Sequence, residues 1–112
     1  MKRVLLVLLA FSAVLLITSC STSKTYYSSY GTSFCMEVTT NDSQVQSDLA
    51  DASWTEGTCT SAGFTGSSCS YTGYADTKSY TITEYWSDAY VTLLGYGTLE
   101  DLCTAMDYTY NE

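Results

Sequence analysis

Cysteine is the residue type with the widest chemistry in this chain of 112 residues. Zinc sites usually present cysteines in pairs two to four residues apart, and dithiol redox sites favour Cys-x-x-Cys. Gaps of 23, 9 and 33 residues separate the last four of the five cysteines, and the chain contains no His. We therefore expect no metal site, no bound cofactor and no redox pair. The five cysteines are Cys20, Cys35, Cys59, Cys69 and Cys103.

The sequence also offers few of the residues that catalytic sites require. Without His, Ser-His-Asp and Cys-His sites are excluded. Paired carboxylates could hydrolyse a glycosidic bond, and the candidates are Asp48 with Asp51 and Glu100 with Asp101. Their spacing is typical of a solvated helix face, and no glycine-rich phosphate loop occurs. We expect that the protein is not an enzyme.

The N-terminal residues have the pattern of an export signal. Lys2 and Arg3 precede an apolar run over residues 4–17, broken only by Ser12. This run is shorter than the roughly 20 residues that a helix needs to cross a bilayer. It predicts a cleaved secretory signal rather than a permanent transmembrane anchor.

The run ends at Ile17-Thr18-Ser19-Cys20, which resembles the signature of bacterial lipoproteins: an aliphatic residue, two small residues, then Cys. The commonest form has Leu, then Ala or Ser, then Gly or Ala, so Thr18 and Ser19 depart from it. The resemblance covers only the first twenty residues. It implies that residues 1–19 are a lipoprotein signal peptide and that Cys20 carries a diacylglyceryl group.

The same resemblance implies acylation of the new amine at Cys20, so that membrane lipid is a partner and several acyl chains give stable anchoring. In the same family the residue after the Cys influences sorting, and Ser21 resembles the residues that accompany default export to the outer membrane. The resemblance therefore implies a location in the cell envelope. The alternative is an ordinary signal peptide, cut near Ser19 or Ser21, in which Cys20 has no role.

Lipid on Cys20 leaves an even number of cysteines. Exported proteins meet an oxidising compartment, so two disulfides are expected. Three connectivities are possible for four cysteines. Closeness in sequence favours Cys59–Cys69, which leaves Cys35–Cys103 to join the first strand to the last helix.

Charge excludes one class of partner. Twelve Asp and Glu face four Lys and Arg, and loss of Lys2 and Arg3 with the leader leaves a net charge of −10. Binding to a phosphate backbone requires Lys and Arg to displace counterions. We expect no nucleic-acid partner.

Composition divides the mature chain into a tether and a domain. Residues 20–33 are rich in Ser, Thr and Tyr and contain no aliphatic residue, which predicts a flexible tether. The alternative is that Tyr26, Tyr27 and Tyr30 pack on the domain. Residues 34–112 then form a small disulfide-stapled domain.

Periodicity assigns the elements of this domain. Strands are predicted at residues 34–39, 69–74, 79–86 and 89–94. Helices are predicted at residues 43–53 and from Thr98, its N-cap, to Met106; residues 107–112 are expected to fray. The expected fold class is α+β, a small antiparallel sheet with two helices on one face.

The two halves are also alike. Residues 55–65 align with residues 99–109, with identical Glu, Cys and Thr and an aromatic residue in the same place. In a Thr-rich chain this match also arises by chance. Separately, Cys59-x₃-Gly63-Phe64-x₄-Cys69 is similar to a pattern in small, uncharacterised cysteine-rich bacterial lipoproteins, and that resemblance implies no activity.

Tyrosine is the remaining signal for function. Tyr71, Tyr80, Tyr85 and Tyr90 lie on predicted strands, and Tyr suits recognition surfaces rich in Ser and Thr. We expect a membrane-anchored envelope lipoprotein with a structural or interaction role. The alternative is a ligand-binding module that uses the Tyr-rich sheet to bind an envelope or host protein or a glycan. The simpler explanation for these tyrosines is that alternate side chains fill the core and the polar face of the sheet.

Overall fold

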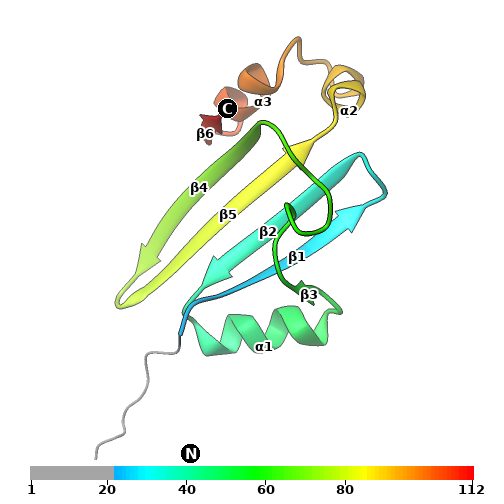
Figure 1. Ribbon diagram of the computed structural model, residues 1–112. Helices are drawn as coiled ribbons and strands as arrows, with labels where there is room; N and C mark the ends of the chain where they lie inside the picture. The colour runs from blue at the N-terminus through cyan, green and yellow to red at the C-terminus, as the bar shows by residue number, and fades with distance from the viewer. Residues whose placement is uncertain (1–21) are drawn as a thin grey trace, which may run out of the picture.

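The computed structural model describes residues 22–112; the predicted signal peptide and Cys20 lie outside the described residues. The fold is an antiparallel sheet of six strands in the order β3-β1-β2-β5-β4-β6 (Figure 1). The strands are β1 (Lys24–Tyr30), β2 (Phe34–Thr40), β3 (Thr55–Glu56), β4 (Ser68–Ala75), β5 (Lys78–Trp86) and β6 (Thr109–Asn111). The helices are α1 (Ser43–Asp51), α2 (Asp88–Leu93) and α3 (Leu99–Ala105). The predicted α+β class with an antiparallel sheet and two disulfides is confirmed, with a third helix added.

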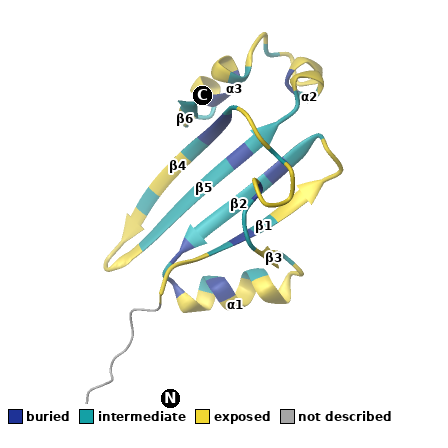
Figure 2. Ribbon diagram, viewed as in Figure 1, coloured by how far each residue is buried: buried dark blue, intermediate teal, exposed yellow. Residues whose placement is uncertain are grey.

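The sheet has an apolar face and a polar face, because side chains alternate along each strand. Cross-strand partners share a face, so the register groups Val38 with Ile82 and Tyr71 on the apolar face. On the polar face Thr hydroxyls bond across the strands: Thr25 to Thr39 at 2.6 Å and Thr72 to Thr81 at 3.0 Å. Most of the sheet is only half-buried (Figure 2).

The segment predicted to be a tether is part of the sheet. From Lys24 to Tyr30 the chain forms β1, which pairs with β2 along its whole length. Tyr26 is only 7% exposed. Hydrogen bonds to β2 and burial of Tyr26 replace the aliphatic side chains that this segment lacks. The tether prediction is therefore wrong for residues 24–33, and the domain begins at Lys24 rather than at residue 34.

Two other local predictions are wrong. Residues 89–94 were expected as a strand, but α2 forms there because the Ser87 side chain accepts a hydrogen bond from the Tyr90 N–H and Val91 is buried. The C-terminal residues do not fray as expected, since β6 pairs with β4. The helix over 43–53 is confirmed as α1, and Thr98 caps α3 as predicted.

One turn recurs at four places, at the C-terminal ends of the three helices and in the turn after β3. A residue with positive φ is followed by an aromatic residue whose N–H returns to a carbonyl five positions earlier, the Schellman arrangement. The positive-φ residues are Ser53, Gly63, Gly95 and Asp107. The bonds run from Trp54 to Leu49, Phe64 to Cys59, Tyr96 to Val91 and Tyr108 to Cys103. Each turn therefore places an aromatic ring directly after a chain reversal.

The disulfides join Cys35 to Cys59 and Cys69 to Cys103, with Cα–Cα distances of 6.0 and 5.3 Å. The pairing favoured from the sequence, Cys59–Cys69 with Cys35–Cys103, is wrong. The reason lies in the register: Cys35 is opposite Tyr85 and Cys69 is opposite Glu84, so the two strand cysteines point to opposite faces of the sheet. The distance between cysteines along the sequence does not show on which face of the sheet each cysteine lies.

Candidate functional site

An aromatic cleft of about 410 Å³ opens on the apolar face of the sheet. It lies where the segment that follows α1 and the N-terminal half of α2 approach the same end of β1, β2 and β5. Phe34 and Met36 come from β2, Trp86 from β5, Trp54 from the turn after α1 and Tyr90 from α2. We call this site the aromatic cleft; its lining residues are Ser28, Ser29, Tyr30, Phe34, Met36, Trp54, Trp86 and Tyr90.

Trp86 is the centre of the ring cluster. Phe34 is its cross-strand partner, and their ring centroids are 4.4 Å apart with an interplanar angle of 60°. On the other side the Tyr90 ring lies 5.3 Å away at 78°. Such edge-to-face contacts are favourable because the positive edge of one ring meets the negative face of the other. The rings therefore meet as walls at steep angles instead of forming a flat platform.

Glu84 lies beneath this cluster and is 6% exposed. The Trp86 Nε1–H donates to its Oε1 at 3.1 Å. Burial raises the pKa of Glu84, and the hydrogen bond from Trp86 opposes this change. Burial also raises the pKa of Tyr108, and the negative charge of Glu84 adds to that rise. The carboxylate thus fixes the orientation of the Trp86 indole.

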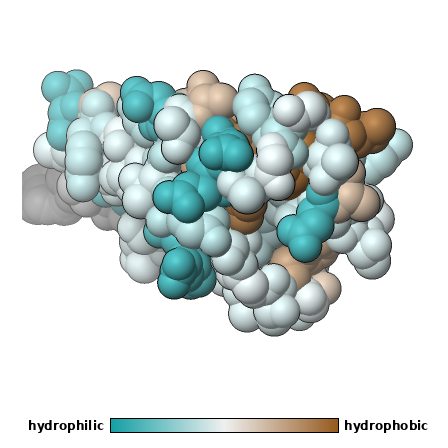
Figure 3. Space-filling model, turned by 90° about the horizontal axis from the view of Figure 1, so that it is seen from above, coloured by the Kyte–Doolittle hydropathy of each residue, from teal (hydrophilic) through white to brown (hydrophobic). Residues whose placement is uncertain are grey.

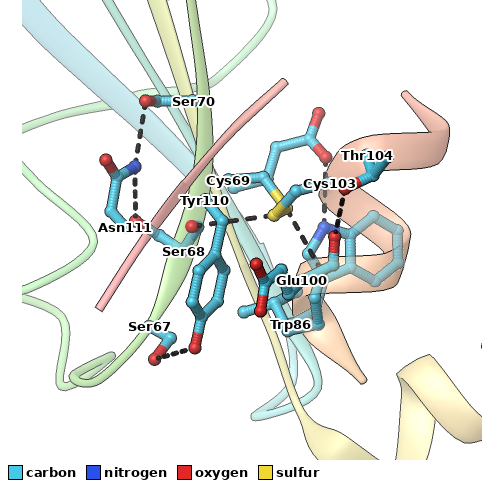
Figure 4. Close-up of a disulfide and its surroundings, with 12 residues drawn as sticks. Ser67, Ser68, Cys69, Ser70, Trp86, Glu100, Cys103, Thr104, Tyr110 and Asn111 are labelled. Atoms are coloured by element: carbon cyan, nitrogen blue, oxygen red, sulfur yellow. Dashed lines mark hydrogen bonds between the residues drawn. A yellow bond between two sulfur atoms is a disulfide. The ribbon is translucent and has the colours of Figure 1, made fainter. Parts of the chain in front are cut away.

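The Cys69–Cys103 disulfide lies beside Trp86 (Figure 4). Polar side chains surround it where β6 meets β4: Tyr110 Oη bonds Ser67 at 3.2 Å, and the Asn111 amide donates to Ser70 at 2.9 Å. These contacts hold the C-terminal strand against β4. They build a wall of the fold and bring together no nucleophile and base.

A second hollow, of about 690 Å³, has a more polar lining and shares Trp86 with the aromatic cleft. Gly and hydroxyl residues dominate it, and Asp88 supplies its acidic group. Nearby, apolar side chains gather over α2 at one end of the molecule (Figure 3), where Leu93 is 80% exposed. Among the described residues, the lining of this hollow holds no second carboxylate that could pair with Asp88.

Asp42 has a structural role at the opposite end of the sheet. Its side chain caps α1 and accepts a hydrogen bond of 2.7 Å from Tyr80 Oη. This bond, the N–H groups of Val45 and Gln44, and Lys78 lower the pKa of Asp42 against the effect of burial. The same hydrogen bond raises the pKa of Tyr80. Tyr80 therefore ties the helix start to the sheet.

The four tyrosines named as a binding surface do not share one surface. Tyr90 lines the aromatic cleft. Tyr71 stacks on Tyr108 with ring centroids 5.7 Å apart, and Tyr80 binds Asp42. Tyr85 is opposite Cys35, on the polar face. Of these four tyrosines, Tyr90 therefore is the one that lines the aromatic cleft.

The two candidate carboxylate pairs are exposed to solvent on helices. Asp48 and Asp51 lie on α1, and Glu100 and Asp101 lie on α3. Within residues 22–112 no three His, Cys, Asp or Glu side chains gather as a metal-binding group. In the same residues no helix combines the length and the apolar character needed to cross a membrane.

Sequence reasoning missed Trp54, Trp86, Phe34 and Met36 as site residues. One signal was present: the chain has two Trp, and both line the aromatic cleft. Their meeting could not be foreseen, because Trp54 follows a helix and Trp86 ends a strand. Comparisons with protein-family models, with curated proteins and with solved structures found no match to this chain.

Proposed function

We propose that the protein is a binding module of the cell envelope, anchored by lipid on Cys20, which holds a partner in its aromatic cleft. The observation that carries this proposal is the concentration of half-exposed rings, including both Trp, in one cleft. Concave sites lined by aromatic side chains with a few polar groups are typical of ligand binding. An interaction role therefore fits better than a purely structural one.

The position of the domain start supports an outward-facing cleft. The chain from Cys20 to Lys24 spans at most about 14 Å, so lipid on Cys20 would hold the beginning of β1 close to the membrane. β1 extends about 20 Å at the usual rise per residue, and Ser28, Ser29 and Tyr30 at its far end line the cleft. The cleft would face away from the anchored end.

The anchor is tested by labelling cells with a fatty-acid analogue. We expect label on the wild-type protein and none on Cys20→Ala. Equal labelling of the two proteins would contradict lipid attachment at Cys20, and the ordinary signal peptide would then replace it.

The cleft is tested by a photocross-linking residue, p-benzoylphenylalanine, placed at Tyr30 or at Tyr74 in the intact cell. Tyr30 lines the cleft and is 73% exposed, whereas Tyr74 is 78% exposed on the polar face. We expect a discrete adduct from Tyr30 alone. Adducts from Tyr74 and none from Tyr30 would move binding to the Tyr-, Ser- and Thr-rich polar face, the second candidate surface.

A further inference from the structure

We propose that the aromatic cleft binds the quaternary ammonium group of a small organic solute. This inference rests on the proposed function, because it names the ligand chemistry of the same cleft. Three features carry it: the angles between the rings, the lack of cations at the cleft, and the scarcity of hydrogen-bond acceptors in its lining.

The rings offer the right electrostatics. The face of an aromatic ring is negative and attracts a cation placed within about 6 Å of the ring centroid, with Trp the strongest. Trp86 meets Phe34 at 60° and Tyr90 at 78°, so ring surfaces enclose a corner from several directions. A roughly spherical cation fits such a corner, whereas a flat sugar ring stacks on a single platform.

The charge distribution favours a cation as well. Among the described residues Lys24 and Lys78 are the basic side chains, and neither lines the cleft. Lys78 begins the strand that Trp86 ends, which separates them by about 27 Å at the usual rise per residue. Glu84, bonded to the Trp86 indole, adds negative charge beneath the rings. With a net charge of −10 on the mature chain, the domain attracts cations and repels anions.

The lining selects a quaternary over a primary ammonium. The polar side chains in the lining are Ser28, Ser29 and the hydroxyls of Tyr30 and Tyr90, and no carboxylate is among them. A primary ammonium would lose hydrogen bonds to water that this lining replaces poorly, which is costly. A quaternary ammonium has no N–H to satisfy, so its transfer into an aromatic cleft avoids that cost.

The test uses choline and its neutral isostere 3,3-dimethylbutan-1-ol, in which carbon replaces the charged nitrogen. Both Trp of the chain line the cleft, so Trp fluorescence reports on binding there. Trp86 also borders the second hollow, and the effect of a change at Trp54 distinguishes the two sites. With NaCl holding the ionic strength constant, we expect a saturable change with choline at about tenfold lower concentration than with the isostere. Sodium alone should give no saturable change.

A variant separates ring electrostatics from simple packing. Trp54→Leu retains apolar bulk but removes a π face, and Trp86 still reports binding. We expect it to weaken choline binding about fivefold and to leave the isostere unaffected. The matched control, Tyr74→Leu on the polar face, should bind choline as the wild type does.

Equal affinity for choline and the isostere would overturn the cation inference and leave the cleft as an apolar binding site, with the proposed function intact. No saturable signal from choline would also overturn it, as would saturable binding of N-acetylglucosamine in its place. The proposed function fails separately, when a cross-linker at Tyr30 gives no adduct.

Discussion

Two disulfide units of this protein share a local turn and differ in everything around it. In each unit a strand cysteine bonds a cysteine that opens a Schellman turn: Cys35 with Cys59, and Cys69 with Cys103. The first turn lies on the polar face, where the Cys59 N–H donates to Glu37 at 2.8 Å. The second turn ends α3 on the apolar face, where Tyr108 stacks on Tyr71.

The difference shows how one backbone motif serves two purposes. The first unit fastens an irregular segment, residues 57–67, onto strands that are complete without it. The second unit secures α3, and α3 contacts α2, β4 and β6, so it organises a whole end of the fold. The second unit also lies close to the aromatic cleft, since α3 contacts α2 and α2 carries Tyr90.

Removal of the disulfides gives the largest expected effect. Because each disulfide restricts the unfolded chain, we expect Cys35→Ala with Cys59→Ala to lower the free energy of unfolding by about 3.5 kcal/mol, and Cys69→Ala with Cys103→Ala by about 3.8 kcal/mol. Urea denaturation measures both. Because the two expected losses of free energy are similar, the units are distinguished by which backbone amides lose protection from hydrogen exchange.

Hydrogen exchange separates the two units. We expect the Cys35/Cys59 variant to lose protection mainly in residues 57–67, and the Cys69/Cys103 variant to lose it in α2, α3 and β6. Loss spread over the same residues in both variants would contradict the different roles of the units.

The aromatic residue after each turn gives the next effect. Tyr108 is half-buried and stacked on Tyr71, whereas Phe64, at the equivalent place, has no ring within stacking distance among the described aromatic pairs. We expect Tyr108→Ala to lower the free energy of unfolding by about 2 kcal/mol and Phe64→Ala by about 1 kcal/mol. Thermal unfolding of both variants measures the difference, and the reverse order would break the comparison.

Exchange of the left-handed residues is a smaller test. Asp107 has φ 62° and Gly63 has φ 101°, and side chains other than Gly are strained in this region by about 1 kcal/mol. We expect Asp107→Gly to stabilise and Gly63→Ala to destabilise by about that amount. A Cβ on Gly63 meets no atom within 4 Å, so its cost is one of backbone strain. Denaturation midpoints that move in the same direction would contradict the shared turn.

The pH dependence of stability supplies the smallest effect, and its sign differs between the two ends of the sheet. Burial raises the pKa of Glu84, so its contribution falls as pH rises from the unfolded value through the folded one. The hydrogen bond from Tyr80 lowers the pKa of Asp42, so its contribution is present above the unfolded value and is lost as pH falls through the folded one.

Glu84→Gln retains an acceptor for Trp86, and Asp42→Asn retains a helix cap. Relative to the wild type, we expect Glu84→Gln to gain stability on going from acid to neutral pH and Asp42→Asn to lose it. Urea titrations at several pH values measure both differences. Slopes of the same sign would show that the two carboxyl groups are not in the environments described.

Local pattern predicted those elements whose own sequence contains the cause. Thr98 and the apolar spacing after it marked α3, and alternation marked β2 and β5. β1 was not predicted because this segment becomes a strand only through pairing with β2. α2 was not predicted because Val91 favours strands, whereas the Ser87 side chain caps a helix at this place. The cleft joins residues from four parts of the chain, so no single stretch of sequence could reveal it.

The pairing of the cysteines shows the same limit. Loop length ranks Cys59–Cys69 first, yet the register places Cys35 and Cys69 on opposite faces. The choice of face depends on which strands pair, and this information is absent from the spacing of the cysteines.

The central claim is that each strand cysteine bonds the Schellman turn that follows it in the chain, so that Cys35 bonds Cys59 and Cys69 bonds Cys103. A non-reducing peptide map, with cleavage at Phe64 to separate Cys59 from Cys69, tests this claim most directly. We predict peptides that join Cys35 to Cys59 and Cys69 to Cys103. A peptide that joins Cys59 to Cys69, together with one that joins Cys35 to Cys103, would contradict the two disulfide units.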